Sequence, residues 1–146
     1  MRYMGLDIGD ATIGIALSDP FGIIAQGHEN YRRVSTKEDI AHLVDIIVAY
    51  EVTMVVAGLP LNMNGTSGPQ AEKVRLLTKQ IEKKLKFSDK LKAPVPVELW
   101  DERLSTVQAE RMMIEADLSR ARRRQIVDKM AAIVILQSFL EIGRAS

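Results

Sequence analysis

Cysteine is absent from the 146 residues, which excludes disulfide frameworks, thiolate zinc sites and cysteine nucleophiles. Aromatic residues are few, at 5%, so no platform for stacking nucleobases is evident. No apolar run approaches the roughly 18 residues of a membrane-spanning helix, and the first residues lack a signal-peptide pattern. A strong charge of one sign is also lacking, because the net charge is +1. We therefore expect a cytoplasmic protein with no membrane partner.

The residues that are present are those of a folded globular protein. Hydrophobic residues make up 47% of the chain and charged residues 27%, which is not the profile of a disordered segment. The length is close to the roughly 150 residues of one domain, and no repeat or long linker divides the chain. We predict a single domain over residues 1–146.

The spacing of apolar residues predicts strands first and then alternating helices and strands. The expected strands cover residues 3–9, 12–18, 23–31, 52–58 and 95–100, the first two forming a hairpin. One expected helix begins at the capping box Ser35–Glu38, and another begins at the capping box Ser105–Gln108 and ends near residue 115. Two further helices are expected over residues 71–85 and 122–142. This order indicates an α/β fold with a mixed sheet flanked by helices.

Asp7 is the first candidate for chemistry, because it stands in an otherwise apolar strand. The face of the hairpin that carries Asp7 is nearly bare, since Gly5 and Gly14 lie on it. A bare face lets a backbone or a phosphate come close. Asp7 could instead cap a turn, but a charge in a buried strand needs a partner or a metal ion.

Three more carboxylates are candidates on weaker grounds. Asp101 and Glu102 end the last strand, where sites of α/β proteins gather, yet acidic residues before a helix also favour its dipole. Alternation predicts that only one of the two reaches a site shared with Asp7. Asp128 lies on a stripe of small and apolar residues in the last helix, where it could simply pair with Arg124.

Taken together, the carboxylates favour a divalent metal centre. Carboxylate oxygens suit Mg²⁺ or Mn²⁺, and two such ions roughly 4 Å apart can activate water for phosphodiester hydrolysis. No histidine is needed for this chemistry, and His42 is interpreted as a surface or packing residue.

Basic residues gather although the total charge is balanced. An arginine run precedes Asp128, and we expect at least one of Arg120, Arg123 and Arg124 to contact phosphate. The lysines between residues 83 and 92 are interpreted as a solvated face. The loop that contains Gly65 and Ser67 opens a helix, so it could hold a phosphate on its N–H groups or be an ordinary helix start.

Four short motifs occur in one order: Met4-Gly5-Leu6-Asp7-Ile8-Gly9, Gly58-Leu59-Pro60, Asp101-Glu102-Arg103-Leu104-Ser105 and Asp128-Lys129-Met130-Ala131-Ala132. The ordered set resembles the RuvX (YqgF) family of bacterial RNase H-like proteins, over nearly the whole chain. The resemblance implies a five-stranded mixed sheet with its first three strands antiparallel. It also implies a metal-dependent nuclease site, which by motif match falls on Asp7, Glu102 and Asp128. The choice of Glu102 over Asp101 rests on the resemblance alone, and Asp10 and Asp101 remain spare candidates for a fourth ligand.

The function expected from the resemblance is metal-dependent hydrolysis of structured nucleic acid, in the processing of the pre-16S rRNA end during ribosome biogenesis. The alternatives are a Holliday junction resolvase acting on branched DNA and a non-catalytic RNA-binding assembly factor. Asp7-Ile8-Gly9 also looks like a kinase phosphate loop, but such kinases use two of these domains. The sequence leaves open RNA or DNA, endo- or exonuclease, and monomer or homodimer.

Overall fold

The structure, a computed structural model, describes residues 1–104 and 120–143, and of residues 120–129 only the helical backbone. The elements in chain order are β1 (Arg2–Ile8), β2 (Thr12–Ser18), β3 (Ala25–Arg32), α1 (Thr36–Ala49), β4 (Val52–Leu59), α2 (Pro69–Lys86), β5 (Val97–Asp101) and α4 (Arg120–Glu141). The helix predicted from Ser105 lies outside the described residues.

One mixed sheet with the strand order β3-β2-β1-β4-β5 organises the chain. The pairs β1–β2 and β2–β3 are antiparallel, whereas β1–β4 and β4–β5 are parallel. This confirms the predicted α/β fold and its five-stranded sheet with the first three strands antiparallel. The carboxyl ends of β1, β4 and β5 therefore meet at one edge of the sheet.

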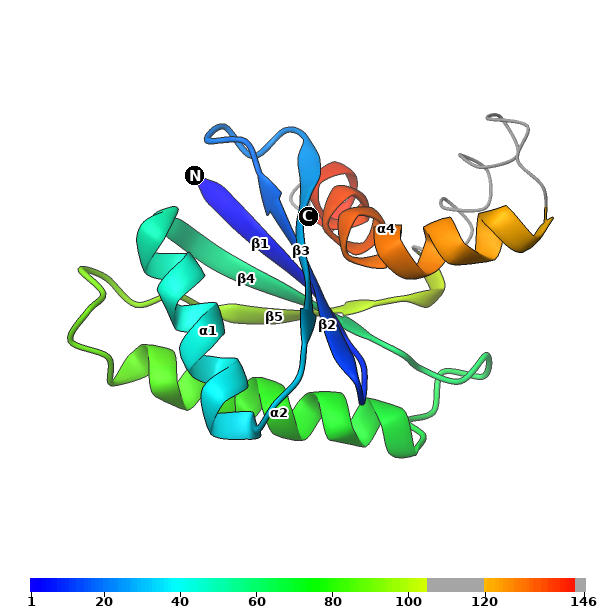
Figure 1. Ribbon diagram of the computed structural model, residues 1–146, viewed down its shortest axis with the longest axis horizontal. Helices are drawn as coiled ribbons and strands as arrows, with labels where there is room; N and C mark the ends of the chain where they lie inside the picture. The colour runs from blue at the N-terminus through cyan, green and yellow to red at the C-terminus, as the bar shows by residue number, and fades with distance from the viewer. Residues whose placement is uncertain (105–119, 144–146) are drawn as a thin grey trace.

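Helices cover both faces of the sheet (Figure 1): α1 and α2 lie on one side, and α4 lies on the other. The alternation along β1 assigns its side chains to these faces. Met4, Leu6 and Ile8 belong to the larger apolar core under α1 and α2. Tyr3 belongs to the smaller core under α4. Asp7 is four residues further along the same strand, so it lies on the same face of the sheet as Tyr3, the face that α4 covers.

The bare face around Asp7 accommodates a closely packed helix. A Cβ atom added to Gly5 would lie 2.6 Å from the Cβ of Leu136 and 3.0 Å from the carbonyl oxygen of Ala132. Only a glycine lets α4 come this near to β1. Asp128 lies one helical turn before Ala132, on the same helix.

Two strands begin two residues later than predicted, and the other strand ends differ by at most one residue. The third strand begins at Ala25 and not at residue 23, because the Asp19 carboxylate accepts the N–H groups of Ile23 and Ile24 and turns the chain. The last strand begins at Val97 and not at residue 95, since Pro96 has no N–H to donate to a ladder.

The helices of the described part follow the prediction more closely. The side chain of Ser35 accepts the N–H of Glu38 and caps α1. The helix α2 begins with Pro69 at its first turn, where proline loses no hydrogen bond. Across residues 1–104 and 120–143, no helix combines the length and the apolar character that a membrane crossing requires.

Candidate functional site

The structure brings Asp7 and Glu102 together at the carboxyl edge of the sheet. Asp7 is half-buried near the end of β1, and Glu102 directly follows β5. The N–H of Glu102 donates to the carbonyl oxygen of Leu59 at 3.1 Å, which ties the residue to the end of β4. The two carboxyl groups interact through a side-chain hydrogen bond and through their charges.

This contact changes the acidity of Glu102. Burial raises its pKa to about 7, and the charge of Asp7, their hydrogen bond and the charge of Asp101 act in the same direction. A carboxyl group that titrates near neutrality beside a second carboxyl is typical of functional sites. A divalent cation would offset the repulsion, and carboxylate oxygens are the ligands that Mg²⁺ prefers. The pair therefore fits a metal ion.

Gly58 on β4 provides the space that Glu102 occupies. A Cβ atom at Gly58 would lie 2.6 Å from Oε1 of Glu102, 2.9 Å from its Cγ and 2.5 Å from Cδ1 of Ile135. Any larger residue would push the carboxyl group or the helix away. The motif Gly58-Leu59-Pro60 thus contributes to the site because Gly58 has no side chain. This role was not predicted from the sequence.

Asp101 faces a different partner from Glu102, as the alternation predicted. Its carboxylate accepts Nε of Arg103 at 3.0 Å from both oxygens and Nη2 at 2.6 Å. The side-chain hydrogen bond from Arg103 lowers the pKa of Asp101, and this outweighs the opposing effect of burial. The geometry thus separates two adjacent acids, placing Glu102 with Asp7 and Asp101 with Arg103.

The remaining predicted residues of the last helix are placed by backbone alone. Asp128 lies in α4, and the side chains of Asp128, Arg120, Arg123 and Arg124 lie outside what the structure describes. Within the described residues, no three His, Asp or Glu side chains gather as a metal-binding group. The third ligand thus stays a prediction.

The loop with Gly65 and Ser67 lies at the same carboxyl edge, after β4. Gly65 has a φ of 85°, which favours glycine. The hydroxyl of Ser67 accepts Nη2 of Arg75 at 3.1 Å, and the loop is exposed from residue 62 to residue 67. Its role in holding phosphate stays a prediction.

Comparison with known proteins identifies the family. The RuvX family, described as Holliday junction resolvase, matches residues 1–142. The chain belongs to the RuvX family. Its members are nucleases, which are hydrolases, so the chain belongs to a family of enzymes.

Relatives and solved structures agree with this assignment. A RuvX relative from Desulforamulus reducens is 50% identical over 98% of each chain and is named "Putative pre-16S rRNA nuclease". A relative from Clostridium novyi with the same name is 51% identical over 97% of this chain and 98% of its own. Thermus thermophilus RuvC in complex with a Holliday junction substrate has a TM-score of 0.65 at 13% identity, covering 99% of this chain and 96% of that one. That likeness confirms the RNase H-like fold.

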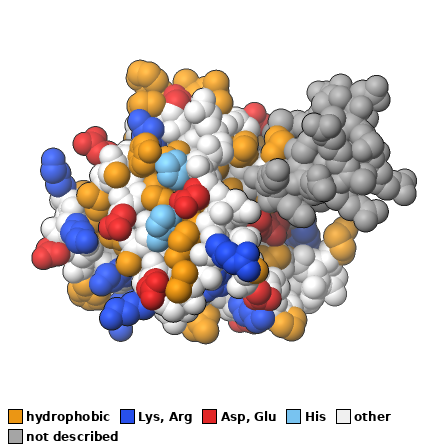
Figure 2. Space-filling model, viewed as in Figure 1, with side chains coloured by type: hydrophobic (Ala, Val, Ile, Leu, Met, Phe, Trp, Pro, Cys, Tyr) orange, Lys and Arg blue, Asp and Glu red, His pale blue; other side chains and the backbone are white. Residues whose placement is uncertain are grey.

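Two other predicted positions in the RuvX chain have ordinary surroundings. Asp10, a spare candidate ligand, is 68% exposed and forms an ion pair of 3.3 Å with Lys73 of α2. His42 stacks on Tyr31 with 4.2 Å between ring centroids, and its Nε2 lies 2.6 Å from Glu29. The face in Figure 2 shows both histidines beside acidic side chains, among interspersed charges of both signs.

One buried carboxylate that was not predicted from the sequence lies on the other side of the sheet. Asp39 of α1 is 1% exposed and accepts hydrogen bonds from Nε of Arg33 at 2.9 Å, the hydroxyl of Tyr31 at 3.0 Å and the N–H of Val34 at 2.9 Å. Burial alone would raise the pKa of Asp39, but these hydrogen bonds outweigh it and lower the pKa. A carboxylate in the first turn of a helix gave no signal of this role, because such residues are common there.

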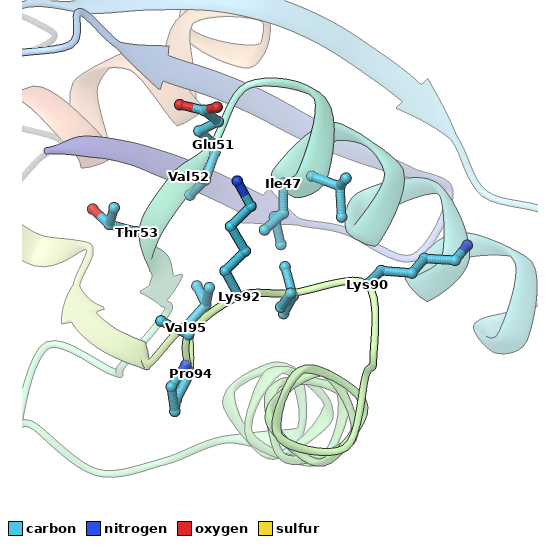
Figure 3. A pocket seen from close by; sticks show the side chains of 11 residues that line it. Ile47, Glu51, Val52, Thr53, Lys90, Lys92, Pro94 and Val95 are labelled. Carbon is cyan, nitrogen blue, oxygen red and sulfur yellow. The ribbon is translucent and has the colours of Figure 1, made fainter.

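A cavity of about 530 Å³ lies away from the carboxylate pair, between α1, the start of β4 and the loop before β5 (Figure 3). Its lining is mostly apolar, and the picture shows Lys92 extending between Ile47 and Val52 while Lys90 points away along α1. The cavity adjoins the amino end of β4, whereas Glu102 is tied to the carboxyl end of that strand. It therefore contains none of the candidate metal ligands.

Proposed function

We propose that this RuvX protein is a metal-dependent nuclease that hydrolyses phosphodiester bonds in structured nucleic acid. The observation that carries the proposal is the contact between Asp7 and Glu102, with the pKa of Glu102 raised to about 7. Two carboxyl groups crowded at the carboxyl edge of a sheet are poorly explained by stability, because burying them together is unfavourable. They are well explained as ligands of cations.

Asp7, Glu102 and Asp128 would hold Mg²⁺ or Mn²⁺. When bound, such ions supply an activated water and charge stabilisation for the departing oxygen, and two of them can clamp both sides of the reacting phosphate. Support for Asp128 comes from its place in α4, since Ala132, one turn further, packs against Gly5 on the face that carries Asp7.

The chain's own residues would orient the ligands and the substrate. Gly58 leaves room for the carboxyl group of Glu102. The hydrogen bond from the N–H of Glu102 to the carbonyl oxygen of Leu59 fixes the backbone at Glu102. We propose that arginines among Arg120, Arg123 and Arg124, together with the N–H groups around Gly65 and Ser67, contact the phosphates of the substrate. Guanidinium forks and helix N-termini are both suited to phosphate.

The substrate that we favour is the end of pre-16S rRNA, and its processing in the cytoplasm would place the protein in ribosome biogenesis. Relatives about 50% identical over nearly their whole length, named for this substrate, support the choice. A four-way DNA junction is the second candidate, because the family description names Holliday junction resolvases. Contacts to phosphate carry no base information and do not distinguish the two.

The test is a cleavage assay on matched substrates. The purified chain is incubated with a precursor 16S rRNA fragment and with a four-way DNA junction, each with Mg²⁺, with Mn²⁺ and with a chelator. We expect RNA cleavage that needs a divalent ion. Cleavage of the junction alone would favour the resolvase, and RNA binding without cleavage of either substrate would favour a non-catalytic assembly factor.

A further inference from the structure

We propose that Arg103 is a positioning residue, which holds residues 61–68, here called the Asn-Gly loop, beside the Asp7–Glu102 pair so that the loop contacts the substrate strand. This role rests on the proposed nuclease function. Arg103 immediately follows Glu102, but its guanidinium bonds to Asp101 and to Met63.

Arg103 connects the end of β5 to the Asn-Gly loop. Its Nε and Nη2 chelate the carboxylate of Asp101, and its own N–H also donates to Oδ1 of Asp101 at 3.0 Å. The remaining Nη1 donates to the carbonyl oxygen of Met63 at 3.2 Å. One planar guanidinium thus fixes the loop to the strand that positions Glu102, a geometry that lysine cannot reproduce.

Polar contacts keep residues 62–67 of the Asn-Gly loop in shape, whereas Leu61 at its start packs against the apolar core. The N–H of Asn62 donates to the carbonyl oxygen of Thr66 at 2.9 Å, and the N–H of Gly65 donates to that of Asn62 at 2.8 Å. The side chain of Asn64 accepts both the N–H and the hydroxyl of Thr66, at 3.1 and 2.6 Å. Residues 62–67 are all exposed, so these bonds, the hydrogen bond from Arg75 to Ser67 and the hydrogen bond from Arg103 to Met63 hold this stretch in place.

The loop presents an apolar side chain at its tip. Met63 is 90% exposed, although its carbonyl oxygen is held by Arg103. Proteins that bind nucleic acid insert such apolar side chains between bases, and the cost of unstacking is smallest where the bases are already single-stranded. The substrate that fits is therefore a strand with exposed bases next to the scissile phosphate, such as a single-stranded end or a branch point, and not a continuous duplex.

The experiment compares Arg103→Ala and Arg103→Lys with Arg32→Ala, an exposed arginine on β3 that serves as the matched loss of charge. Affinity for an RNA with a duplex and a single-stranded end is measured without divalent ions, and KM and kcat are measured with them. We expect both Arg103 variants to weaken binding and raise KM about tenfold, which is about 1.4 kcal/mol, with kcat changed less than about threefold. Met63→Ala should weaken binding of the single-stranded end but not of a blunt duplex.

Each outcome of this experiment supports or overturns the proposed positioning role of Arg103. A wild-type affinity in Arg103→Lys would show that charge alone matters and would overturn the proposal, as would a fall in kcat with KM unchanged. Equal losses in Arg32→Ala and Arg103→Ala would overturn it as well. Faster hydrogen exchange at the Gly65 and Thr66 amides of Arg103→Ala, with an unchanged melting temperature, would support the proposal, because it would show that the Asn-Gly loop is released while the protein stays folded. If the wild-type chain binds RNA but cuts nothing, the nuclease proposal fails while the binding data still test Arg103.

Discussion

Asp39 and Glu102 are both acidic side chains inside the fold, and their surroundings are opposite. Asp39 is enclosed by donors from Arg33, Tyr31 and Val34, and its pKa is lowered. Glu102 lies against Asp7, and its pKa is raised to about 7. The first arrangement stabilises the charged form and with it the fold, whereas the second leaves a charge that a cation would satisfy. A buried carboxylate is therefore informative only when its partners are known.

The largest effect is expected on activity. Asp7→Asn and Glu102→Gln should each lower the rate of metal-dependent RNA cleavage by roughly a thousandfold, about 4 kcal/mol of activation free energy. The free energy of unfolding should not fall, because each variant removes a repulsion. Single-turnover cleavage and urea denaturation measure the two quantities. Glu98→Gln, an exposed glutamate on β5, is the control and should keep the wild-type rate. A wild-type cleavage rate in Asp7→Asn would show that the Asp7–Glu102 pair takes no part in cleavage.

The reverse pattern is expected at Asp39. Asp39→Ala leaves Arg33 without its buried carboxylate, and the free energy of unfolding should fall by roughly 3 kcal/mol. The cleavage rate of the folded fraction should stay near that of the wild type. Urea denaturation at a fixed pH of 7 gives the first value, and cleavage at a temperature well below the melting point gives the second. A loss of activity in fully folded Asp39→Ala would mean that the two carboxylates are not separable in this way.

Replacing Gly58 should have a smaller effect, on both the cleavage rate and the free energy of unfolding. Gly58→Ala places a Cβ 2.6 Å from Oε1 of Glu102 and 2.5 Å from Ile135, so we expect about 2 kcal/mol of destabilisation and about tenfold slower cleavage. Gly14→Ala is the matched control, because its Cβ would lie 3.5 Å from the Cβ of Asp7 and 3.4 Å from that of Ala132, which are ordinary contacts. Equal effects of both substitutions would argue against crowding of Glu102 as the cause.

The pH dependence of stability should separate the two carboxyl groups by sign. The folded pKa of Glu102 is raised from 4.5 to about 7, so the folded state binds more protons between these values and stability falls as the pH rises through them. Asp39 has a lowered pKa, so its contribution is present above 3.8 and is lost as the pH falls through its folded pKa. Because Glu102 is only partly buried, its effect should be about 1 to 2 kcal/mol.

Urea midpoints test this difference when they are measured with a chelator from below pH 4, where Asp39 titrates, through the interval between pH 4.5 and 7.5. Glu102→Gln should remove the decline in stability over that interval and should leave the acid limb below pH 4 unchanged. A decline of the same slope in Glu102→Gln would mean that another group titrates there.

Much of the fold could be predicted from the sequence, because the alternation of apolar residues reports directly which side of a strand is buried. Met4, Leu6 and Ile8 gave one face of β1, and the same rule separated Asp101 from Glu102. The rule could not supply the start of β3, since the Asp19 turn depends on hydrogen bonds to N–H groups several residues later.

The site was less accessible to prediction than the fold. Asp7 stood out as a charge among apolar residues, but Glu102 was chosen by resemblance, and its contact with Asp7 depends on the pairing of β1, β4 and β5. The roles of Gly58 and Arg103 were missed for the same reason. A glycine's role depends on what fills the space beside it, and an arginine's on the oxygens within its reach, and neither is visible in local spacing.

The central place of β1 in the sheet has a consequence for when the site comes into being. Asp7 belongs to the first strand of the chain, yet Glu102 reaches it only through β4 and β5, whose parallel pairing needs long connections. Contacts between residues so distant in sequence form late in folding, after the cost of closing large loops has been met. A chain that has not finished folding therefore has no joined carboxylate pair, and the candidate metal site comes into being only with the complete sheet.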